Sequence, residues 1–243
     1  MKIELQNLCF AYPQGQRVID DLSLVIEQGE SVGLIGANGA GKSTLLQLLV
    51  GLLMPQQGQV VVGHTPLTSK TLPWIRERIG LVFQDPDDQL FLPTVGEDVA
   101  FGPRNRGLEE PAVAALVDSA LATVGLTALK DRPPYQLSGG EKKAASLATV
   151  LALEPDVLVL DEPTASLDPR ARRQVIQLLR QFDHTRLVTS HDLDLILDVC
   201  ERTIVLLDGR IVADGPSAQI LADEPLLWSA GLELPLRFQP RPN

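Results

Sequence analysis

Residues 36–44, GANGAGKST, combine glycines, a lysine and hydroxyl side chains at a spacing suited to holding phosphates. They match the pattern G-x-x-x-x-G-K-[ST], in which glycines let backbone N–H groups turn toward a phosphate chain. Lys42 would reach the β and γ phosphates, and Ser43 would offer its hydroxyl to Mg²⁺. The predicted ATP-binding residues of this P-loop are Gly36, Ala37, Asn38, Gly39, Ala40, Gly41, Lys42, Ser43 and Thr44.

A second motif, DVLVLDEP, is an apolar strand that ends in Asp161-Glu162. A carboxylate at the carboxyl end of a buried strand can hold the water shell of a magnesium ion opposite a P-loop. Glu162 suits a general base that orients water on the γ-phosphate. Taken alone, the pair could instead favour a helix N-terminus by its charge. Together with the P-loop it predicts a nucleoside triphosphatase.

The elements that must position these residues follow from hydrophobic periodicity. KIELQNLCFAY and DLSLVIEQGE alternate apolar and polar residues, which predicts an antiparallel β-layer. SVGLIG is a short apolar run that precedes the helical pattern GKSTLLQLLVGLL, as in the opening of a parallel α/β unit. Further buried strands are predicted at IGLVFQ, DVLVLDEP, RLVTSH and RTIVLLDG, with a helical insertion from about 95 to 154.

Composition narrows the possible functions. The chain has 243 residues and a formal net charge of −10, which argues against a nucleic-acid backbone as the main partner. Hydrophobic residues make up 44% and aromatic residues 4%, so the core is aliphatic, as in α/β proteins. No apolar run reaches the roughly 18 residues of a membrane span. If the protein works at a membrane, it does so through another chain.

The segment LSGGE, residues 137–141, opens the helical stretch EKKAASLATVLAL and gives a second helix end able to bind an anion. With it, nearly the whole chain, from about Ile3 to Ala222, resembles an ABC-type ATPase. The resemblance implies that Leu137, Ser138, Gly139, Gly140 and Glu141 clamp the γ-phosphate of nucleotide held by a second ATPase subunit. Glu141 replaces the more frequent Gln. Lys142 and Lys143 are interpreted as the polar face of this helix.

The same resemblance assigns further roles. Tyr12 would stack on adenine, although a surface aromatic at a strand end is the alternative. Gln84, after GLVF, would sense the γ-phosphate and Mg²⁺, so that Ser43, Gln84 and Asp161 form the metal site. His191, after RLVTS, would be the switch histidine that acts with Glu162, Gln84 and Lys42 in catalysis. The dimer loop would be Ser166, Leu167 and Asp168.

The implied fold is α/β: a P-loop NTPase fold of the ABC ATPase type, with a RecA-like parallel-sheet core, an antiparallel β-subdomain and a helical signature subdomain. We expect the ATPase domain at 1–222, its helical subdomain at about 86–154, and a C-terminal tail at 223–243 that is either a packing strap or a dimer contact. ATP and Mg²⁺ are the implied ligands. ATP-driven dimer closure, with hydrolysis and reopening, is the implied mechanism.

The stretch VFQDPDDQLFLPTVGEDVAFGPRN resembles energy-coupling factor ATPases of the cobalt/nickel and vitamin groups. That resemblance implies a homodimer or a heterodimer with a paralogue, on the cytoplasmic face of the membrane. It also implies a transmembrane coupling protein and a substrate-capture membrane protein as partners. Cobalt, nickel or biotin is the expected cargo. The alternatives are a subunit of another ABC importer or exporter, or a stand-alone soluble ATPase.

Three aspartates, Asp85, Asp87 and Asp88, crowd the sequence after Gln84. A calcium loop beginning at Asp85 would need Gly at its sixth position and Glu at its twelfth, where Leu90 and Gly96 stand. We expect Asp88 to cap a helix beginning near Gln89 and Leu90. Partner docking through Asp85, Asp87, Asp88, Leu90 and Phe91 is the favoured interpretation, with a solvated turn or a metal site as alternatives.

Overall fold

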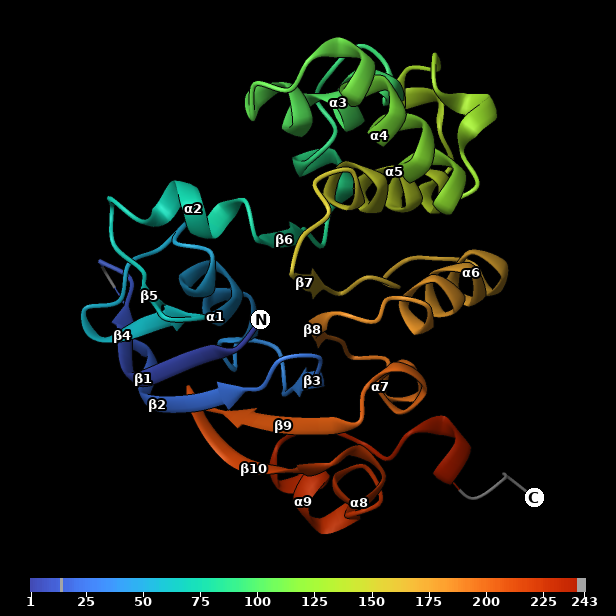
Figure 1. Ribbon diagram of the computed structural model, residues 1–243. Helices are drawn as coiled ribbons and strands as arrows, with labels where there is room; N and C mark the ends of the chain where they lie inside the picture. Colours follow the sequence, from blue (N-terminus) through green and yellow to red (C-terminus); the bar gives the residue numbers. More distant parts are fainter. Residues whose placement is uncertain (14, 240–243) are drawn as a thin grey trace.

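Two β-sheets form the body of the protein, as the computed structural model shows for residues 1–13 and 15–239 (Figure 1). The smaller sheet has the strand order β2-β1-β4-β5 and is antiparallel. The larger sheet has the order β10-β9-β3-β8-β7-β6, and its strands are parallel except for β10 at the edge. The predicted antiparallel layer, the parallel α/β core and the mixed α/β fold class are confirmed.

The strands are β1 (Ile3–Ala11), β2 (Arg17–Ile26), β3 (Ser31–Ile35), β4 (Gln57–Val62), β5 (Thr65–Pro66), β6 (Ile79–Val82), β7 (Val157–Asp161), β8 (Thr185–Thr189), β9 (Arg202–Leu207) and β10 (Arg210–Pro216). The α-helices are α1 (Lys42–Leu49), α2 (Leu72–Arg76), α3 (Val95–Asn105), α4 (Glu110–Thr123), α5 (Gly139–Leu151), α6 (Pro169–Arg180), α7 (Leu193–Val199), α8 (Ser217–Ile220) and α9 (Glu224–Ser229). Four short 3₁₀ turns are η1 (Pro86–Asp88), η2 (Thr127–Leu129), η3 (Pro134–Gln136) and η4 (Leu236–Phe238).

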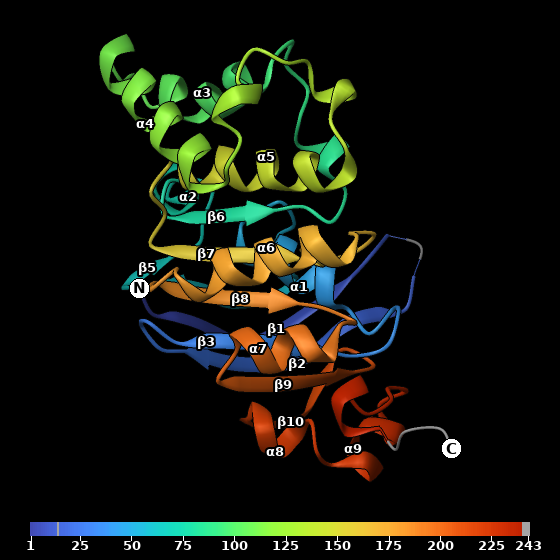
Figure 2. The same ribbon diagram turned by 90° about the vertical axis from the view of Figure 1, so that its right-hand side faces the viewer.

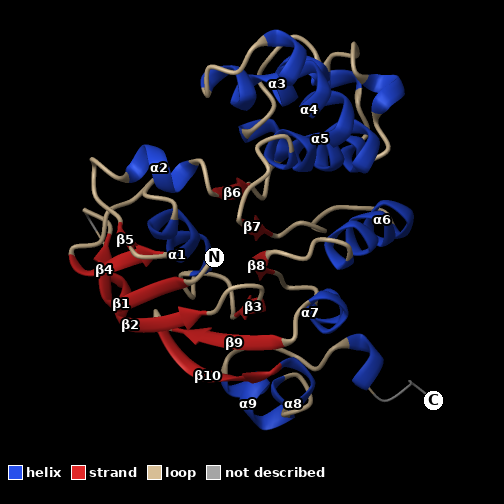
Figure 3. Ribbon diagram, viewed as in Figure 1, coloured by secondary structure: helices blue, strands red, loops and turns tan. Residues whose placement is uncertain are grey.

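Buried apolar side chains gather in three clusters, one for each layer boundary. The first lies between the two sheets and includes α1. The second covers the other face of the parallel sheet under α6 and α7, which lie side by side in front of the strands in Figure 2. The third lies among α3, α4 and α5 and forms a core of its own. These three helices therefore make a separate packed body above the sheet edge, visible in blue at the top of Figure 3.

The segment after Ala222 packs onto the second cluster. Leu227 and Ala230 are fully buried there. Arg237 Nε donates to Asp194 Oδ1 on α7 at 2.6 Å, which ties η4 to the body. Trp228 is 76% exposed and faces away from these contacts. Residues 240–243 of the expected tail lie outside the described residues. Within residues 1–13 and 15–239, no helix has both the length and the apolar character needed to span a bilayer.

Candidate nucleotide site

The P-loop follows β3 and leads into α1, which is the strand–loop–helix setting predicted from its sequence. Lys42 is only 7% exposed, and its Nζ donates to the carbonyl oxygens of Gly36 at 2.7 Å and Ala37 at 3.2 Å. Burial lowers the pKa of Lys42, while the nearby carboxylates of Glu162 and Asp161 favour its charged form. The lysine is thus held inside the loop that would surround the phosphates.

Glycine is required at two positions of this loop. Gly41 precedes α1 with a left-handed φ of 104°, where a side chain would be strained. A Cβ at Gly36 would lie 2.3 Å from the carbonyl oxygen of Leu206, so only glycine allows the loop to approach β9 this closely. Both constraints shape the loop into a cradle of backbone N–H groups at the N-terminus of α1.

Asp161 and Glu162 end β7 beside the P-loop. Asp161 Oδ1 accepts a 2.6 Å hydrogen bond from Thr189 Oγ1 on β8. Glu162 is 7% exposed and has a φ of 47°, an unfavourable conformation for a residue other than glycine and typical of functional positions. Its Oε2 accepts from His191 N at 3.1 Å, whereas its buried Oε1 has no hydrogen-bond partner within the described chain. One carboxylate oxygen is therefore fixed by a hydrogen bond, and the other is buried without one.

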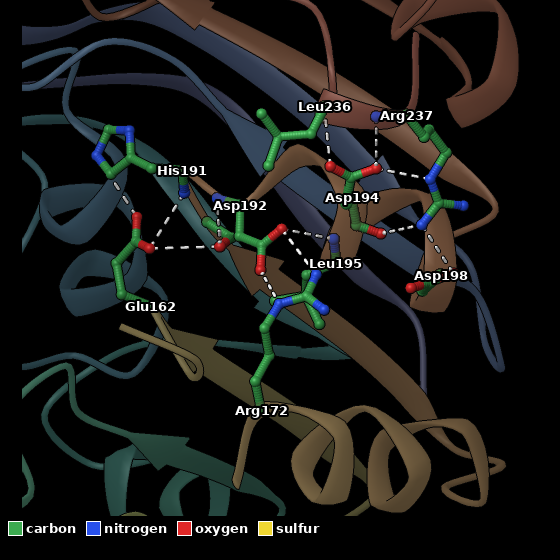
Figure 4. A network of polar contacts seen from close by, with 10 residues as sticks. Glu162, Arg172, His191, Asp192, Asp194, Leu195, Asp198, Leu236 and Arg237 are labelled. Atoms are coloured by element: carbon green, nitrogen blue, oxygen red, sulfur yellow. Dashed lines mark hydrogen bonds and ion pairs between the residues drawn. The ribbon is translucent and has the colours of Figure 1, made fainter. Parts of the chain in front are cut away.

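His191 lies directly after β8, and both its backbone N–H and its ring contact the carboxylate of Glu162, as Figure 4 shows. Its Nε2 lies 3.4 Å from Lys42 Nζ and 3.5 Å from Glu162 Oε1. The next residue, Asp192, caps α7 by accepting from Leu195 N and pairs with Arg172 of α6 at 2.5 and 3.0 Å. The sequence indicated His191 but not Arg172, because the pairing depends on how α6 and α7 pack together.

Two adjoining cavities collect the predicted residues. One, of about 530 Å³, is lined by the P-loop together with Tyr12, Gln84, Glu162 and His191. The other, of about 540 Å³, extends from Ser43 past Gln84 to residues 85, 86 and 88. The Tyr12 side chain is 42% exposed, and its hydroxyl lies 3.2 Å from Thr44 Oγ1. The structure therefore gathers Tyr12, the P-loop, Gln84, Asp161, Glu162 and His191 around one space.

The residues present fit a magnesium ion. Ser43, Gln84 and Asp161 all line both cavities, and they offer a hydroxyl, an amide carbonyl and a carboxylate. These are the oxygen ligands that Mg²⁺ prefers beside substrate phosphates. The unpartnered Glu162 Oε1 lies in the same place.

The signature residues lie elsewhere. Ser138 is the N-cap of α5 and forms a capping box with Glu141: Glu141 N donates to Ser138 Oγ at 3.3 Å, and Ser138 N donates to Glu141 Oε2 at 2.8 Å. Leu137 is buried in the helical body, and Gly140 allows α6 to approach, since a Cβ there would lie 2.7 Å from that of Ala171. None of residues 137–141 lines either of the two nucleotide cavities described above.

The predicted dimer loop lies between these regions. Ser166 has a left-handed φ of 61° and lines the second cavity. Leu167 packs against the second apolar cluster. Asp168 is the N-cap of α6, accepting from Arg170 N at 2.8 Å and Ala171 N at 2.9 Å, and these bonds lower the pKa of its carboxyl group. The loop therefore connects the nucleotide cavities to α6, the helix whose Arg172 pairs with Asp192.

The stretch after Gln84 differs in detail from the sequence expectation. Asp85, not Asp88, is the capping residue: its Oδ1 accepts from Asp87 N at 2.9 Å at the start of η1. No helix begins near Gln89, and the next one, α3, starts at Val95. Leu90 is 7% exposed and belongs to the core of the helical body, so it cannot present a docking surface. Asp87 is paired with Lys142 at 2.6 Å.

Phe91 does present an exposed apolar surface. It is 63% exposed and stacks edge-to-face on Phe101, which is 43% exposed, with ring centroids 5.1 Å apart. Asp85 and Asp88 are exposed beside the second cavity. Of the predicted docking residues, Asp85, Asp88 and Phe91 therefore remain available to a partner.

Lys143 contradicts its interpretation as part of a polar helix face. It is 1% exposed, and its Nζ donates to the carbonyl oxygens of Phe83 at 3.1 Å and Gln84 at 2.7 Å. Burial lowers its pKa to about 8. A sequence signal was available, because Lys143 falls on the same helical stripe as Leu147 and Val150, both of which are buried.

A sequence-family model, curated relatives and solved structures that resemble this chain all point to the same family. A sequence model described as ABC transporter matches residues 19–165. A putative ABC transporter ATP-binding protein of Geobacter sulfurreducens is 54% identical over 237 residues, which cover 98% of this chain and 95% of that protein. The energy-coupling factor transporter ATP-binding protein EcfA1 of Methanospirillum hungatei is 43% identical, covering 96% and 86%. CbiO1 from Clostridium perfringens, solved as part of the ABC transporter complex CbiONQ, aligns with a TM-score of 0.82 and 36% identity over 93% of both chains.

The position of Glu162 predicts the outcome of replacing it with glutamine. Glu162→Gln keeps an oxygen that can accept from His191 N but removes the basic carboxylate, so steady-state ATP hydrolysis should fall by about a thousandfold or more. ATP binding should persist, and ATP-bound protein should accumulate as a dimer on size-exclusion chromatography. Phosphate release measures the first effect. Turnover at the unsubstituted rate would remove Glu162 from the role of base.

Proposed function

Because this chain belongs to the ABC transporter family, whose ATP-binding subunits hydrolyse ATP to drive transport, we propose that it energises an energy-coupling factor type importer. Its similarity to EcfA1 and to CbiO1 supports that group. The cargo would be cobalt, nickel or a vitamin such as biotin. The working place would be the cytoplasmic face of the membrane, reached through a transmembrane coupling protein that binds a separate substrate-capture protein.

The observation that carries the mechanism is the separation of the signature from the nucleotide cavity. Residues 137–141 line neither cavity of their own chain, yet Ser138 opens a thirteen-residue helix whose N-terminus can bind an anion. A second ATPase subunit, identical or paralogous, would place this helix end on the γ-phosphate of the first. Closing two such interfaces around ATP, and reopening them after hydrolysis, would move the attached membrane proteins.

Each residue of the site then has a defined task. Lys42 neutralises charge on the transferred phosphate, and Tyr12 borders the space where adenine would lie. Glu162 would orient the attacking water through Oε1, which has no hydrogen-bond partner within the described chain, while His191, bonded through its backbone N–H to Glu162, would contact the γ-phosphate. When bound at Ser43, Gln84 and Asp161, Mg²⁺ supplies further charge neutralisation. Phosphoryl transfer needs this alignment and neutralisation more than covalent participation.

We propose that the exposed surface formed by Asp85, Asp88, Phe91 and Phe101 docks a helix of the coupling protein that carries arginine or lysine residues. Its two exposed aromatic rings would contact apolar side chains of that helix, and its two aspartates would pair with the helix's basic residues. The surface adjoins Gln84, so an occupant would be connected directly to the nucleotide cavity.

The transport role is tested by co-expression with the membrane proteins encoded beside this chain. We expect the complex to co-purify and to confer ATP-dependent uptake of radiolabelled cobalt, nickel or biotin into cells, with uptake abolished by Glu162→Gln. A stand-alone ATPase would co-purify with no membrane protein. An exporter subunit would lower accumulation of its cargo instead of raising it.

Charge reversal at Asp88 tests the docking surface. Asp88 is the sharpest choice, because Asp85 caps η1 and Asp87 is paired with Lys142. Asp88→Lys should reduce recovery of the coupling protein by about tenfold while ATP binding stays unchanged. Glu224→Lys, an equal charge change on exposed α9, is the matched control. Equal recovery of the complex from both variants would exclude this surface.

Glu141 allows a test of the shared site. The backbone N–H of Ser138 lowers the pKa of the Glu141 carboxyl group, which keeps an anion where a partner's γ-phosphate would bind. Glu141→Gln retains an acceptor for that N–H but removes the charge. In a Glu162→Gln background, the ATP concentration at half-maximal dimerisation should fall by about threefold. An unchanged midpoint would show that this helix end does not face a partner's phosphates.

A further inference from the structure

Residues 83–89, the Q-loop, are attached to the signature helix α5 by hydrogen bonds of Lys143 and Gln89 and by one exposed ion pair. Lys143 donates to the carbonyl oxygens of Phe83 and Gln84. Gln89 Nε2 donates to Ser146 O at 2.8 Å and Thr149 Oγ1 at 2.7 Å, and its Oε1 accepts from Phe83 N at 3.2 Å. The pair of Lys142 and Asp87 also joins the two segments, but it is exposed to solvent and therefore contributes little to holding them together.

Lys143 is the most unusual member of this set because it is a fully buried cation bonded to backbone carbonyls. A neutral side chain of similar length would fill the same space without the cost of removing a charge from water. It would also leave the carbonyls of Phe83 and Gln84 without these donors. The carboxylates of Asp161, Asp85 and Glu162 lie near enough to favour the charged form of Lys143. Gln84, whose backbone carbonyl accepts a hydrogen bond from Lys143, also lines the nucleotide cavity.

Ser138 is the N-cap of the same helix. Lys143 is five positions further along, about 7.5 Å along the helix axis. The α3–α5 body has its own apolar core, so a displacement of α5 would be shared by α3 and α4. Gln84 faces the cavity of its own chain, whereas Ser138 lines neither nucleotide cavity of that chain.

We propose that Lys143 is a positioning residue that makes the Q-loop and the signature helix one mechanical unit, so that occupancy of a chain's own site sets the place of its Ser138 on the partner's nucleotide. This inference rests on the proposed function, in which Ser138 acts across a dimer. It assigns the coupling between the two shared sites to one buried side chain. Gln89 supports the same connection from the Q-loop side.

The test replaces Lys143 with methionine, which keeps its length but donates no hydrogen bond. We expect Lys143→Met to bind a fluorescent ATP analogue as monomer within about twofold of the unsubstituted protein. The Hill coefficient of ATP hydrolysis should fall toward 1, and kcat should fall by about tenfold with little change in KM. Lys143→Arg, which restores donors, should recover cooperativity. Lys142→Met, which loses only an exposed pair, is the matched control.

A double-mutant cycle separates coupling from simple destabilisation. In the Glu162→Gln background, Lys143→Met and Ser138→Ala should each raise the ATP concentration needed for dimerisation. If Lys143 acts through Ser138, the double variant should resemble Ser138→Ala alone. Multiplicative effects of the two substitutions, or unchanged cooperativity in Lys143→Met, would overturn the proposal. Gln89→Leu provides a second route to the same measurement if Lys143→Met does not fold.

Failure of the proposed function would give a different pattern. If the unsubstituted protein forms no ATP-dependent dimer and hydrolyses ATP with a Hill coefficient near 1, the shared site itself is wrong. If it dimerises cooperatively and Lys143→Met does so equally well, only the coupling role of Lys143 is wrong.

Discussion

The arrangement of the site depends on one constraint, that the parallel strands β3, β8, β7 and β6 are neighbours and end at the same sheet edge. The P-loop follows β3, His191 follows β8, Asp161 ends β7 and Gln84 follows β6. Residues far apart in the chain are therefore brought together without any long loop. As a result, His191 Nε2 lies 3.4 Å from Lys42 Nζ and 3.5 Å from Glu162 Oε1.

Charges buried at this edge show that the site is assembled before nucleotide arrives. Lys42 and Glu162 are each 7% exposed, and Glu162 keeps an unfavourable backbone conformation. Burying charged groups is costly unless their neighbours compensate, and here the P-loop carbonyls and the His191 amide do so. Within the described chain, Glu162 Oε1 is the oxygen of this carboxylate left without a hydrogen bond, and in the proposed function it orients the attacking water. Charged groups that are already in place stabilise a transition state better than water does, because water must first reorient.

The sequence predicts a residue's environment well when that environment is set by its neighbours in the chain, and poorly when it is set by packing against distant segments. The P-loop, the carboxylates after β7 and the strand pattern are local signals, and the fold class they indicated is confirmed. Lys143 and Leu90 were misinterpreted because their environments arise from packing between segments. Composition around Lys143 indicates a polar helix face, yet tertiary contact with the Q-loop buries it. Leu90 similarly faces the core of the α3–α5 body, because the chain turns inward after η1.

The chain enters the α3–α5 body after β6 and leaves it before β7, and Leu147 and Val150 of α5 also pack on the sheet in the second cluster. Its second junction includes Glu154, which has a left-handed φ of 48° and separates α5 from β7. The first junction is the Q-loop, whose backbone is bonded to α5 and not to the sheet at Phe83 and Gln84. These hydrogen bonds group Phe83 and Gln84 with the helices and not with the sheet, although Gln84 lines the cavity at the end of the sheet. Under the role proposed for Lys143, a ligand that draws Gln84 toward the P-loop would draw the signature helix with it, and one chain would thereby report its own nucleotide to the other.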